Sequence, residues 1–241
     1  MIEITSVNKV FASRGSEIRA VNIVTISVRE GDFVLILGRS GSGKSTLLGM
    51  FAGLIRPTSG RVSVRGKDIN SLSEDQVAEL RAREIGFVFQ FSGLIPTLTA
   101  IENVLLPTLF RQDNTADRDT AHTLLGKVGI LDRANAYPAT LSSGEMKRVA
   151  IARALVNSPS ILIADEPTGD LDVDTENEIM ALFRQLNQEG ITIVMVTHNP
   201  DLIPCATQIY RMDHGMLEKV SGSPSCDNRK PVSGPAVTGG S

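Results

Sequence analysis

Cysteine is scarce in this chain, which has 241 residues and only two cysteines, Cys205 and Cys226. Two cysteines do not build the disulfide framework of a small secreted domain, so a reducing cytosol is the simplest compartment that the composition predicts. Long apolar runs are missing as well. The longest, such as Phe33–Leu37, have the length of a strand, whereas a membrane-spanning helix needs about 20 apolar residues. The composition therefore favours neither a disulfide scaffold nor a membrane-spanning chain.

Basic residues are not in excess either. Lysine and arginine number 24 against 27 aspartates and glutamates, which gives a net charge of −3. A chain without a global positive field has no general attraction for nucleic acid, and we expect no nucleic-acid partner. The first residues, Met1–Thr5, lack the basic and apolar regions of a secretory signal peptide, so we expect no such signal here.

The apolar pattern predicts an α/β core. Residues 2–28 alternate as in half-exposed strands, and the continuous run 33–37 is typical of a parallel strand that is buried on both faces. Further strands are predicted at 61–64, 85–89, 160–164, 191–196 and 207–212. Helices are predicted at 44–52, 73–81 and 173–189, with Ser73 as a helix cap.

Two stretches interrupt or follow this core. Residues 91–157 are rich in helical patterns, and we interpret them as a helical insertion into one folded domain that spans residues 1–220. Serine, glycine and proline supply 12 of the last 21 residues, so 221–241 is predicted to be a disordered tail. No internal repeat is visible in the sequence, which indicates a single domain of this kind rather than a fused pair.

A phosphate-binding loop lies between the predicted strand 33–37 and the predicted helix 44–52. The loop fits the pattern Gly-x-x-x-x-Gly-Lys-Ser, in which the glycines permit backbone torsions that turn several N–H groups toward one anion. Lys44 would place a cation on the terminal phosphates of a nucleotide, and Ser45 would supply an oxygen to Mg²⁺. The candidate nucleotide-binding residues are Gly38, Arg39, Ser40, Gly41, Ser42, Gly43, Lys44, Ser45 and Thr46.

An acidic pair, Asp165 and Glu166, closes the apolar run 161–164. Alone it could be an ordinary turn, but here it follows a buried strand that we expect to lie beside the strand of the phosphate loop. In that place Asp165 would hold Mg²⁺, largely through water. Glu166 would then polarise the water that attacks the terminal phosphate.

The segment Leu141–Glu145 has two compatible interpretations. Ser142 and Glu145 form the S-x-x-E pattern of a capping box, which is a routine helix start. A capped helix start with Gly144 near it is also a site for phosphate. Because the phosphate loop already surrounds one side of a nucleotide, the second anion-binding helix start is best explained as serving the nucleotide held by another copy of the chain.

These motifs, in this order, resemble the nucleotide-binding subunit of the ATP-binding-cassette (ABC) family, and the resemblance covers residues 1–220. It implies a P-loop NTPase fold of the cassette type: a RecA-like α/β core, an N-terminal antiparallel β subdomain and an inserted α-helical subdomain. It also implies an ATPase that uses ATP and Mg²⁺, with two copies holding two ATP molecules head to tail. The signature residues that would meet the partner's ATP are Leu141, Ser142, Ser143, Gly144 and Glu145.

The resemblance assigns five further positions. Gln90 matches the Q-loop glutamine that reaches Mg²⁺ and senses the γ-phosphate, and His198 matches the switch histidine that contacts this phosphate. Asp170 and Asp172 lie in the D-loop that crosses the dimer interface, and Phe11 matches the aromatic residue that stacks on adenine. Without the family, Gln90 would be interpreted as a surface residue, His198 as structural and Phe11 as part of the core.

The sequence departs from the family pattern at several of these positions. Arg39 stands where the family often has proline, and Phe11 stands where most relatives have tyrosine. In the signature, Ser143 replaces the first glycine and Glu145 replaces glutamine. The added Cβ of Ser143 lies close to the expected γ-phosphate and so bears on how tightly this half-site closes.

A narrower resemblance is visible in residues 89–104, 165–169 and 196–200, which look like the lipoprotein-release, macrolide-exporter and FtsE-like ATPases. It implies an ATPase subunit at the cytoplasmic face of the cell membrane that drives integral permease subunits on a separate chain. An FtsE-like regulator, which controls a cell-wall enzyme without moving substrate, stays open as the alternative. DNA-repair ABC proteins fit less well, because only about fifty residues separate Gln90 from Leu141, where those proteins carry a long coiled coil. Translation-factor ABC proteins carry two cassettes.

The stretch 91–98 contains Gly93 and Pro96, so we expect it to be a loop. Clustered apolar side chains on a surface loop often mark an interface, and this loop lies next to Gln90. We therefore expect the permease to dock here; the alternative is that these side chains fold back onto the helical insertion. The apolar side chains are Phe91, Leu94, Ile95 and Leu98.

Overall fold

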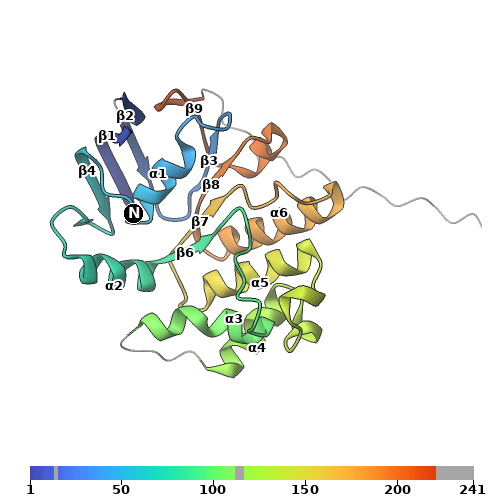
Figure 1. The fold of residues 1–241 in the computed structure, drawn as a ribbon. Coiled ribbons are helices and arrows are strands. Elements are labelled where there is room, and N and C mark those ends of the chain that lie inside the picture. Colours follow the sequence, from blue (N-terminus) through green and yellow to red (C-terminus); the bar gives the residue numbers. More distant parts are fainter. Residues whose placement is uncertain (14–15, 112–116, 221–241) are drawn as a thin grey trace, which may run out of the picture.

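A six-stranded sheet with the order β10-β9-β3-β8-β7-β6 forms the centre of the fold (Figure 1). The computed structural model describes residues 1–13, 16–111 and 117–220, so the predicted tail lies outside the described residues. Strands β9, β3, β8, β7 and β6 are parallel, and β10 pairs antiparallel with β9 at one edge. The strands are β3 (Phe33–Leu37), β6 (Ile85–Val88), β7 (Ile161–Asp165), β8 (Thr192–Thr197), β9 (Gln208–Asp213) and β10 (Met216–Lys219).

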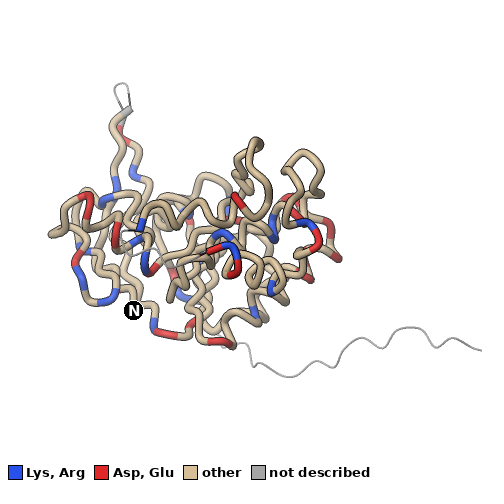
Figure 2. Tube along the Cα trace, turned by 90° about the horizontal axis from the view of Figure 1, so that it is seen from below, with Lys and Arg blue, Asp and Glu red and all other residues tan. Residues whose placement is uncertain are grey.

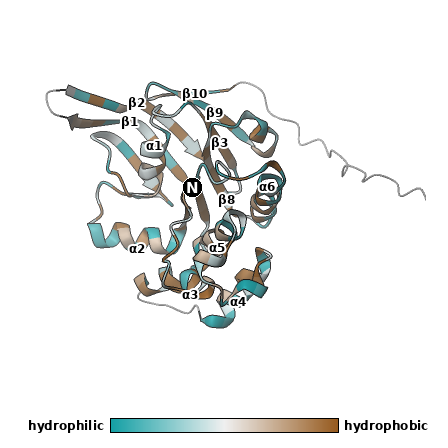
Figure 3. Ribbon diagram, turned by 45° about the vertical axis from the view of Figure 1, so that its right-hand side comes forward, coloured by the Kyte–Doolittle hydropathy of each residue, from teal (hydrophilic) through white to brown (hydrophobic). Residues whose placement is uncertain are grey.

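A second, antiparallel sheet has the order β2-β1-β4-β5. Its side chains alternate as the sequence predicts: Ile2 and Ile4 are buried, whereas Glu3 and Thr5 are exposed. The β1–β2 hairpin extends outward from the body of the molecule (Figure 3). The strands are β1 (Ile2–Ser13), β2 (Ser16–Val28), β4 (Ser59–Val64) and β5 (Lys67–Asp68).

The apolar run of β3 is continuous because both faces of the central sheet are covered. Val34 and Ile36 belong to a core shared with α1 and the antiparallel sheet. Phe33 and Leu35 belong to a second core on the opposite face, shared with α5 and α6. The α-helices are α1 (Lys44–Phe51), α2 (Glu74–Glu84), α3 (Ala100–Leu105), α4 (Arg118–Lys127), α5 (Ser143–Leu155) and α6 (Val173–Gln188). The predicted α/β class is confirmed.

The segment between β6 and β7 is rich in helices over its described residues, and these helices lie below the central sheet (Figure 1). It contains α3, α4 and α5, together with short 3-10 segments. None of the described helices is both long and apolar enough to cross a bilayer. The 3-10 segments are η1 (Leu106–Phe110), η2 (Leu131–Arg133), η3 (Pro138–Thr140) and, after β8, η4 (Pro200–Cys205).

The sheet order corrects one prediction. Strand β7, which ends in the acidic pair, does not lie beside β3; β8 lies between them and pairs in parallel with both. The end of β8, which leads into His198, therefore lies between the phosphate loop and Glu166. Sequence reasoning also missed β5 and β10, which are short edge strands with few apolar residues.

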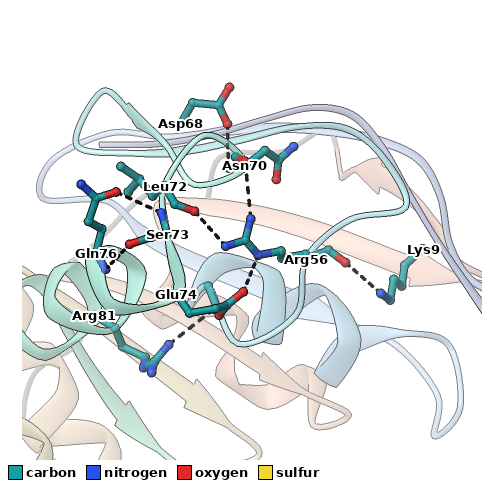
Figure 4. A network of polar contacts seen from close by, with 10 residues as sticks. Lys9, Arg56, Asp68, Asn70, Leu72, Ser73, Glu74, Gln76 and Arg81 are labelled. Carbon is teal, nitrogen blue, oxygen red and sulfur yellow. Dashed lines mark hydrogen bonds and ion pairs between the residues drawn. The ribbon is translucent and has the colours of Figure 1, made fainter.

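Arg56 anchors the connection between α1 and α2 (Figure 4). Its guanidinium donates to the Glu74 carboxylate (2.9 Å), and its carbonyl oxygen accepts from the Lys9 ammonium of β1 (2.8 Å). Ser73 caps α2 by accepting a hydrogen bond from the Gln76 N–H (3.2 Å), as predicted. These links join the antiparallel sheet to the start of α2. Acidic and basic residues are interspersed along the chain (Figure 2).

Candidate functional site

The glycine-rich loop 38–43 joins the carboxyl end of β3 to the start of α1. Gly43 is the N-cap of α1 and has φ 107°, a torsion that L side chains rarely adopt. A Cβ on Gly43 would lie 2.1 Å from the carbonyl oxygen of Ala20, and a Cβ on Gly38 would lie 2.5 Å from that of Met212. The close approach of neighbouring backbone therefore requires glycine at both positions.

The start of α1 carries unpaired backbone donors. The first hydrogen bond of this helix runs from the Leu47 N–H to the Gly43 carbonyl oxygen (3.0 Å). The amides of Lys44, Ser45 and Thr46 therefore have no partner within the helix. No acidic residue lies in the first turn, and the helix dipole leaves partial positive charge at this end. This arrangement suits a phosphate group.

The Lys44 ammonium lies inside the loop, with only 5% of the residue exposed. It donates to the carbonyl oxygens of Gly38 (2.8 Å) and Arg39 (3.0 Å). Its third contact is Glu166 Oε1 at 3.5 Å. The Ser42 hydroxyl of the same loop is buried and has no hydrogen-bond partner among the described residues. The loop therefore offers both a cation and a free polar group to an anion.

These groups line an open cavity of about 870 Å³, a volume in the range of small-molecule and cofactor sites. The lining draws on several distant segments: the loop and helix start at 39–46, Ile18–Ala20 of β2, and the turn between β9 and β10. Three further side chains complete it, and these are Gln90, Glu166 and His198. The structure thus brings together residues that the sequence motifs name separately.

Glu166 is held in a strained backbone conformation. Its φ is 42°, in the left-handed region that non-glycine residues seldom adopt, and its N–H donates to the Val196 carbonyl oxygen (2.9 Å). Its carboxylate reaches the loop, with Oε2 2.8 Å from His198 Nδ1 and Oε1 3.5 Å from Lys44 Nζ. Such strain is typical of functional sites, where it aims a side chain in one direction.

Asp165 lies deeper, and burial raises the pKa of its carboxyl above the ordinary value. The hydrogen bond with the Ser45 hydroxyl opposes this shift, and the charge on Glu166 adds to it. A bound cation would favour the ionised form of Asp165. Among the described residues no three Asp, Glu, His or Cys side chains form a metal-binding group. Mg²⁺ at Asp165 and Ser45 would take its other ligands from phosphate and water, as this ion commonly does.

The segment 141–145 begins α5 away from this cavity. The Ser142 hydroxyl accepts from the Glu145 N–H (3.2 Å), and the Glu145 carboxylate accepts from the Ser142 N–H (2.7 Å), so the predicted capping box is confirmed. Gly144 packs against α6, since a Cβ there would lie 2.6 Å from the Thr175 methyl carbon. No residue of this segment belongs to the lining of the 870 Å³ cavity in the described part of the chain.

Comparison with known proteins identifies the family. The family model described as "ABC transporter" matches residues 21–169. The chain belongs to the ABC transporter family. An uncharacterized ABC transporter ATP-binding protein of Methanocaldococcus jannaschii is 43% identical over 221 residues, which cover 91% of this chain and 99% of that protein.

Two further likenesses refine the identification of this ABC domain. The macrolide export ATP-binding/permease protein MacB of Syntrophobacter fumaroxidans is 42% identical over 92% of this chain. The chain spans about a third (32%) of that protein's length. The dimeric structure of a post-hydrolysis state of the ATP-binding cassette MJ0796, bound to ADP and Pi, matches with a TM-score of 0.85 at 39% identity, covering 92% of this chain and 100% of that one. The predicted cassette fold and the likeness to macrolide-exporter ATPases are therefore confirmed.

Phe11 is 40% exposed and does not belong to the lining of the 870 Å³ cavity. Its ring faces Lys9, whose Nζ lies 5.1 Å from the ring centroid. Its cross-strand partner Ile18 does line the cavity. Because directly paired residues share one face of a sheet, Phe11 and Ile18 form one apolar surface beside the loop.

The two D-loop aspartates have different surroundings. Asp172 is the N-cap of α6: its carboxylate accepts from the Thr175 N–H (3.0 Å) and hydroxyl (2.7 Å), and these bonds lower the pKa of Asp172. Asp170 is exposed and lines a groove of about 630 Å³. This groove lies between residues 89–98, which we call the Q-loop, and the start of α5. Gln90 lines both the groove and the nucleotide cavity.

The Q-loop has no helix or strand, as predicted for 91–98, and side chains of the helical insertion hold it. On α5, Lys147 donates to the Gln90 carbonyl oxygen (2.6 Å), and Arg153 donates to those of Ser92 (2.6 Å) and Gly93 (2.8 Å). These contacts satisfy carbonyl groups that no sheet or helix partner reaches. Residues 89–93 are therefore tied to the same helix that begins with the signature.

Asn103 of α3 holds the second half of the Q-loop. It is fully buried; its amide donates to the carbonyl oxygens of Ile95 (3.1 Å) and Leu98 (3.0 Å) and accepts from the Ile95 N–H (2.7 Å). The four apolar side chains of the loop divide into two kinds. Phe91 and Ile95 are exposed, at 72% and 37%, whereas Leu94 packs partly against the core and Leu98 is half-buried.

Sequence reasoning missed several of these residues. Lys147, Arg153 and Asn103 bear on the site through backbone contacts alone, and a basic side chain in a helical segment is normally a solvated surface residue. Arg19 and His214 line the nucleotide cavity only because β2 and the β9–β10 turn approach the loop. Asn103 lies in the stretch 89–104 that carries the narrower resemblance, but that resemblance gives it no role. No local motif marks the other four positions, since their placement depends on contacts between distant segments.

Proposed function

We propose that this chain is the ATP-binding and ATP-hydrolysing subunit of a membrane transporter of the macrolide-exporter and lipoprotein-release type. The observation that carries the proposal is the convergence of Lys44, Glu166 and His198 beside an anion site built by glycines. Residues 1–220 form the cassette, with the helical part at about 91–157 inserted into it. Nothing in the described residues favours an FtsE-like regulator over a transporter subunit.

In this proposal the loop amides and Lys44 bind the terminal phosphates of ATP. Glu166 accepts a proton from water, the water oxygen bonds to the γ-phosphorus, and the bond from this phosphorus to the ADP oxygen breaks. His198 keeps the Glu166 carboxylate in place through its 2.8 Å contact, and it would contact the γ-phosphate of a bound ATP. Ser45, Asp165 and Gln90 would hold Mg²⁺, which supplies positive charge to the phosphate oxygens when it is bound.

Two copies of the chain complete each site. The capped start of α5 has exposed Ser142 and Ser143 and does not belong to its own chain's nucleotide cavity. A helix start of this kind binds anions, and the ATP of a second copy is the anion that the signature would meet. The dimeric cassette of the solved relative supports this arrangement.

The permease docks at the groove of about 630 Å³ beside the Q-loop. Phe91 lines this groove and supplies exposed apolar surface, and Ile95 of the same loop is exposed as well. Gln90 connects the groove with the nucleotide cavity. A permease segment seated in the groove would therefore sense whether ATP is bound. Because ATP is a cytoplasmic substrate, the cassette would lie at the cytoplasmic face of the membrane, attached through the permease.

Replacing Glu166 with glutamine tests the hydrolytic role. Glutamine has the same shape and can still bond His198, but it does not accept the proton, so Glu166→Gln should bind ATP and lose about 10²–10⁴ in hydrolysis rate. The unconsumed ATP should hold a dimer that size-exclusion chromatography detects. Lys44→Ala should instead weaken ATP binding itself.

Glu79→Gln is the matched control, because Glu79 pairs with Arg83 within α2 and does not line the nucleotide cavity. This variant should hydrolyse ATP at the parental rate. A Glu166→Gln protein with near-parental turnover would remove Glu166 from its role and contradict the proposed mechanism.

A further inference from the structure

Lys147 is a buried lysine, with 4% of its surface exposed. No described carboxylate forms an ion pair with its ammonium. Burial lowers the pKa of Lys147, and the charge on Asp170 opposes this shift. Lysine is almost never fully buried unless it is paired, because removing an ammonium from water is unfavourable. Other contacts must therefore offset the burial of this group.

Those contacts are two backbone carbonyl groups of the Q-loop. The Lys147 ammonium lies 2.6 Å from the Gln90 carbonyl oxygen and 3.3 Å from that of Phe89. Strand β6 ends at Val88, so these are the first carbonyl groups beyond its ladder of hydrogen bonds. Lys147 thus holds the chain at the point where strand becomes loop.

Because Lys147 lies on α5, its contact connects the Q-loop to the helix that begins with the signature. Helix α5 begins at the Ser142 cap, and Lys147 lies on the helix five residues later. The same helix therefore carries the signature at its start and the support of Gln90 one turn further on. Gln90 faces both the nucleotide cavity and the groove that Asp170 also lines.

We propose that Lys147 is a positioning residue for ATP hydrolysis, which fixes the Gln90 backbone relative to the signature helix. The inference rests on the proposed ATPase function and adds a physical link between the two sites of a dimer. A shift of α5, when its signature meets the partner's ATP, moves the support of Gln90 in its own site. A purely structural role would instead satisfy two carbonyl groups without affecting the chemistry through Gln90.

A double-mutant cycle separates these two roles. Lys147→Met keeps the length of the side chain and removes its donors; it is combined with Gln90→Ala, and each protein is assayed for kcat and KM with Mg·ATP. If Lys147 acts by placing Gln90, Lys147→Met should lower kcat about 10- to 100-fold, the range expected for a displaced group. The KM for ATP should change less than about threefold, since Lys147 does not line the nucleotide cavity.

The decisive result is the double variant. Lys147→Met should add no further loss of kcat in the Gln90→Ala background. Lys127→Met is the matched control: Lys127 pairs with Glu189 away from the nucleotide cavity and the groove, and its loss should leave kcat unchanged. A double variant that is slower than Gln90→Ala by the full single-variant factor would overturn the inference. So would a Lys147→Met protein with the parental kcat.

Amide hydrogen exchange provides a measurement that does not depend on hydrolysis. In the nucleotide-free protein, Lys147→Met should speed exchange at residues 89–93 by about tenfold, because the loop opens more readily without its support; unchanged exchange overturns the inference. If Lys147→Met does not fold, Lys147→Gln replaces it in the double-mutant cycle. Glutamine keeps an N–H donor on a shorter side chain. A loss of kcat that disappears in the Gln90→Ala background supports the inference, and a loss that adds in full overturns it. A Gln90→Ala variant with the parental kcat overturns this inference but leaves the Glu166 test of the proposed function intact.

Discussion

Replacing glycine with alanine at two positions of the phosphate loop should have unequal effects. Gly41 and Gly43 both have positive φ, 78° and 107°. They differ in their surroundings: a Cβ on Gly41 would meet nothing within 4 Å, whereas a Cβ on Gly43 would lie 2.1 Å from the carbonyl oxygen of Ala20. Gly41→Ala therefore introduces torsional strain alone, and Gly43→Ala introduces strain together with a backbone collision.

The two contributions set the expected loss in the free energy of unfolding. A non-glycine residue in the left-handed region costs about 1–2 kcal/mol, which is the whole expectation for Gly41→Ala. At Gly43 the strain is about 1–3 kcal/mol. A collision of this kind adds about 1–3 kcal/mol, because the loop or β2 must move by about 1 Å. Gly43→Ala should thus lose about 2–6 kcal/mol.

Thermal unfolding of the nucleotide-free protein measures the difference. For a domain of about this size, 1 kcal/mol shifts Tm by about 2–4 °C. Gly41→Ala should lower Tm by about 2–8 °C, and Gly43→Ala by about 4–24 °C. Gly43→Ala should also weaken ATP binding more, since its backbone shift displaces the amides at the start of α1. Equal losses at the two positions would show that the approach of β2 does not require glycine at Gly43.

Three further predictions follow from the site. Mixing Lys44→Ala with Ser142→Glu subunits should restore part of the ATPase rate that each lacks, because a mixed dimer keeps one intact composite site; monomers that hydrolyse ATP at full rate at every concentration would contradict this. Phe91→Asp with Ile95→Asp should leave folding and basal ATPase unchanged and abolish co-purification with the permease, and a variant that still binds the permease would move docking elsewhere. The hydrogen bond from the Ser142 N–H, above all, lowers the pKa of Glu145 from 4.5. The stabilisation from the ionised Glu145 carboxylate is therefore present above pH 4.5 and is lost as pH falls through the lowered pKa of the folded protein. Glu145→Gln should lack this pH-dependent stabilisation, so the free energies of urea unfolding of the two proteins should differ above pH 4.5 and converge in more acidic solution. A difference that stays constant with pH would refute the assignment.

Local patterns in the sequence predicted most of the elements that form the site. The run Phe33–Leu37 indicates a strand covered on both faces, and its alternate side chains do enter two different cores. Ser73 and Ser142 cap helices because the residue three positions later completes each capping box. These features depend on interactions between residues close in the chain, so the sequence displays them directly.

The position of the acidic pair was predicted less well. Asp165 and Glu166 do end a buried strand, but β8 separates that strand from β3. The order of strands in a parallel sheet depends on crossover connections, and the apolar runs of β3, β7 and β8 are too alike to specify their neighbours. The error has a consequence for the site, since it is the end of β8 that brings His198 to the Glu166 carboxylate.

The amino-acid sequence shows the chemical groups of the candidate site directly: the glycine-rich loop, the carboxylates at a strand end and the capped start of α5. Each of these is a short motif whose geometry follows from neighbouring residues. The folded chain sets which of these groups meet across the molecule. It buried Lys147 against the Gln90 carbonyl oxygen and moved the signature away from its own cavity, because long-range packing, rather than local sequence, sets the distance between α5 and the central sheet.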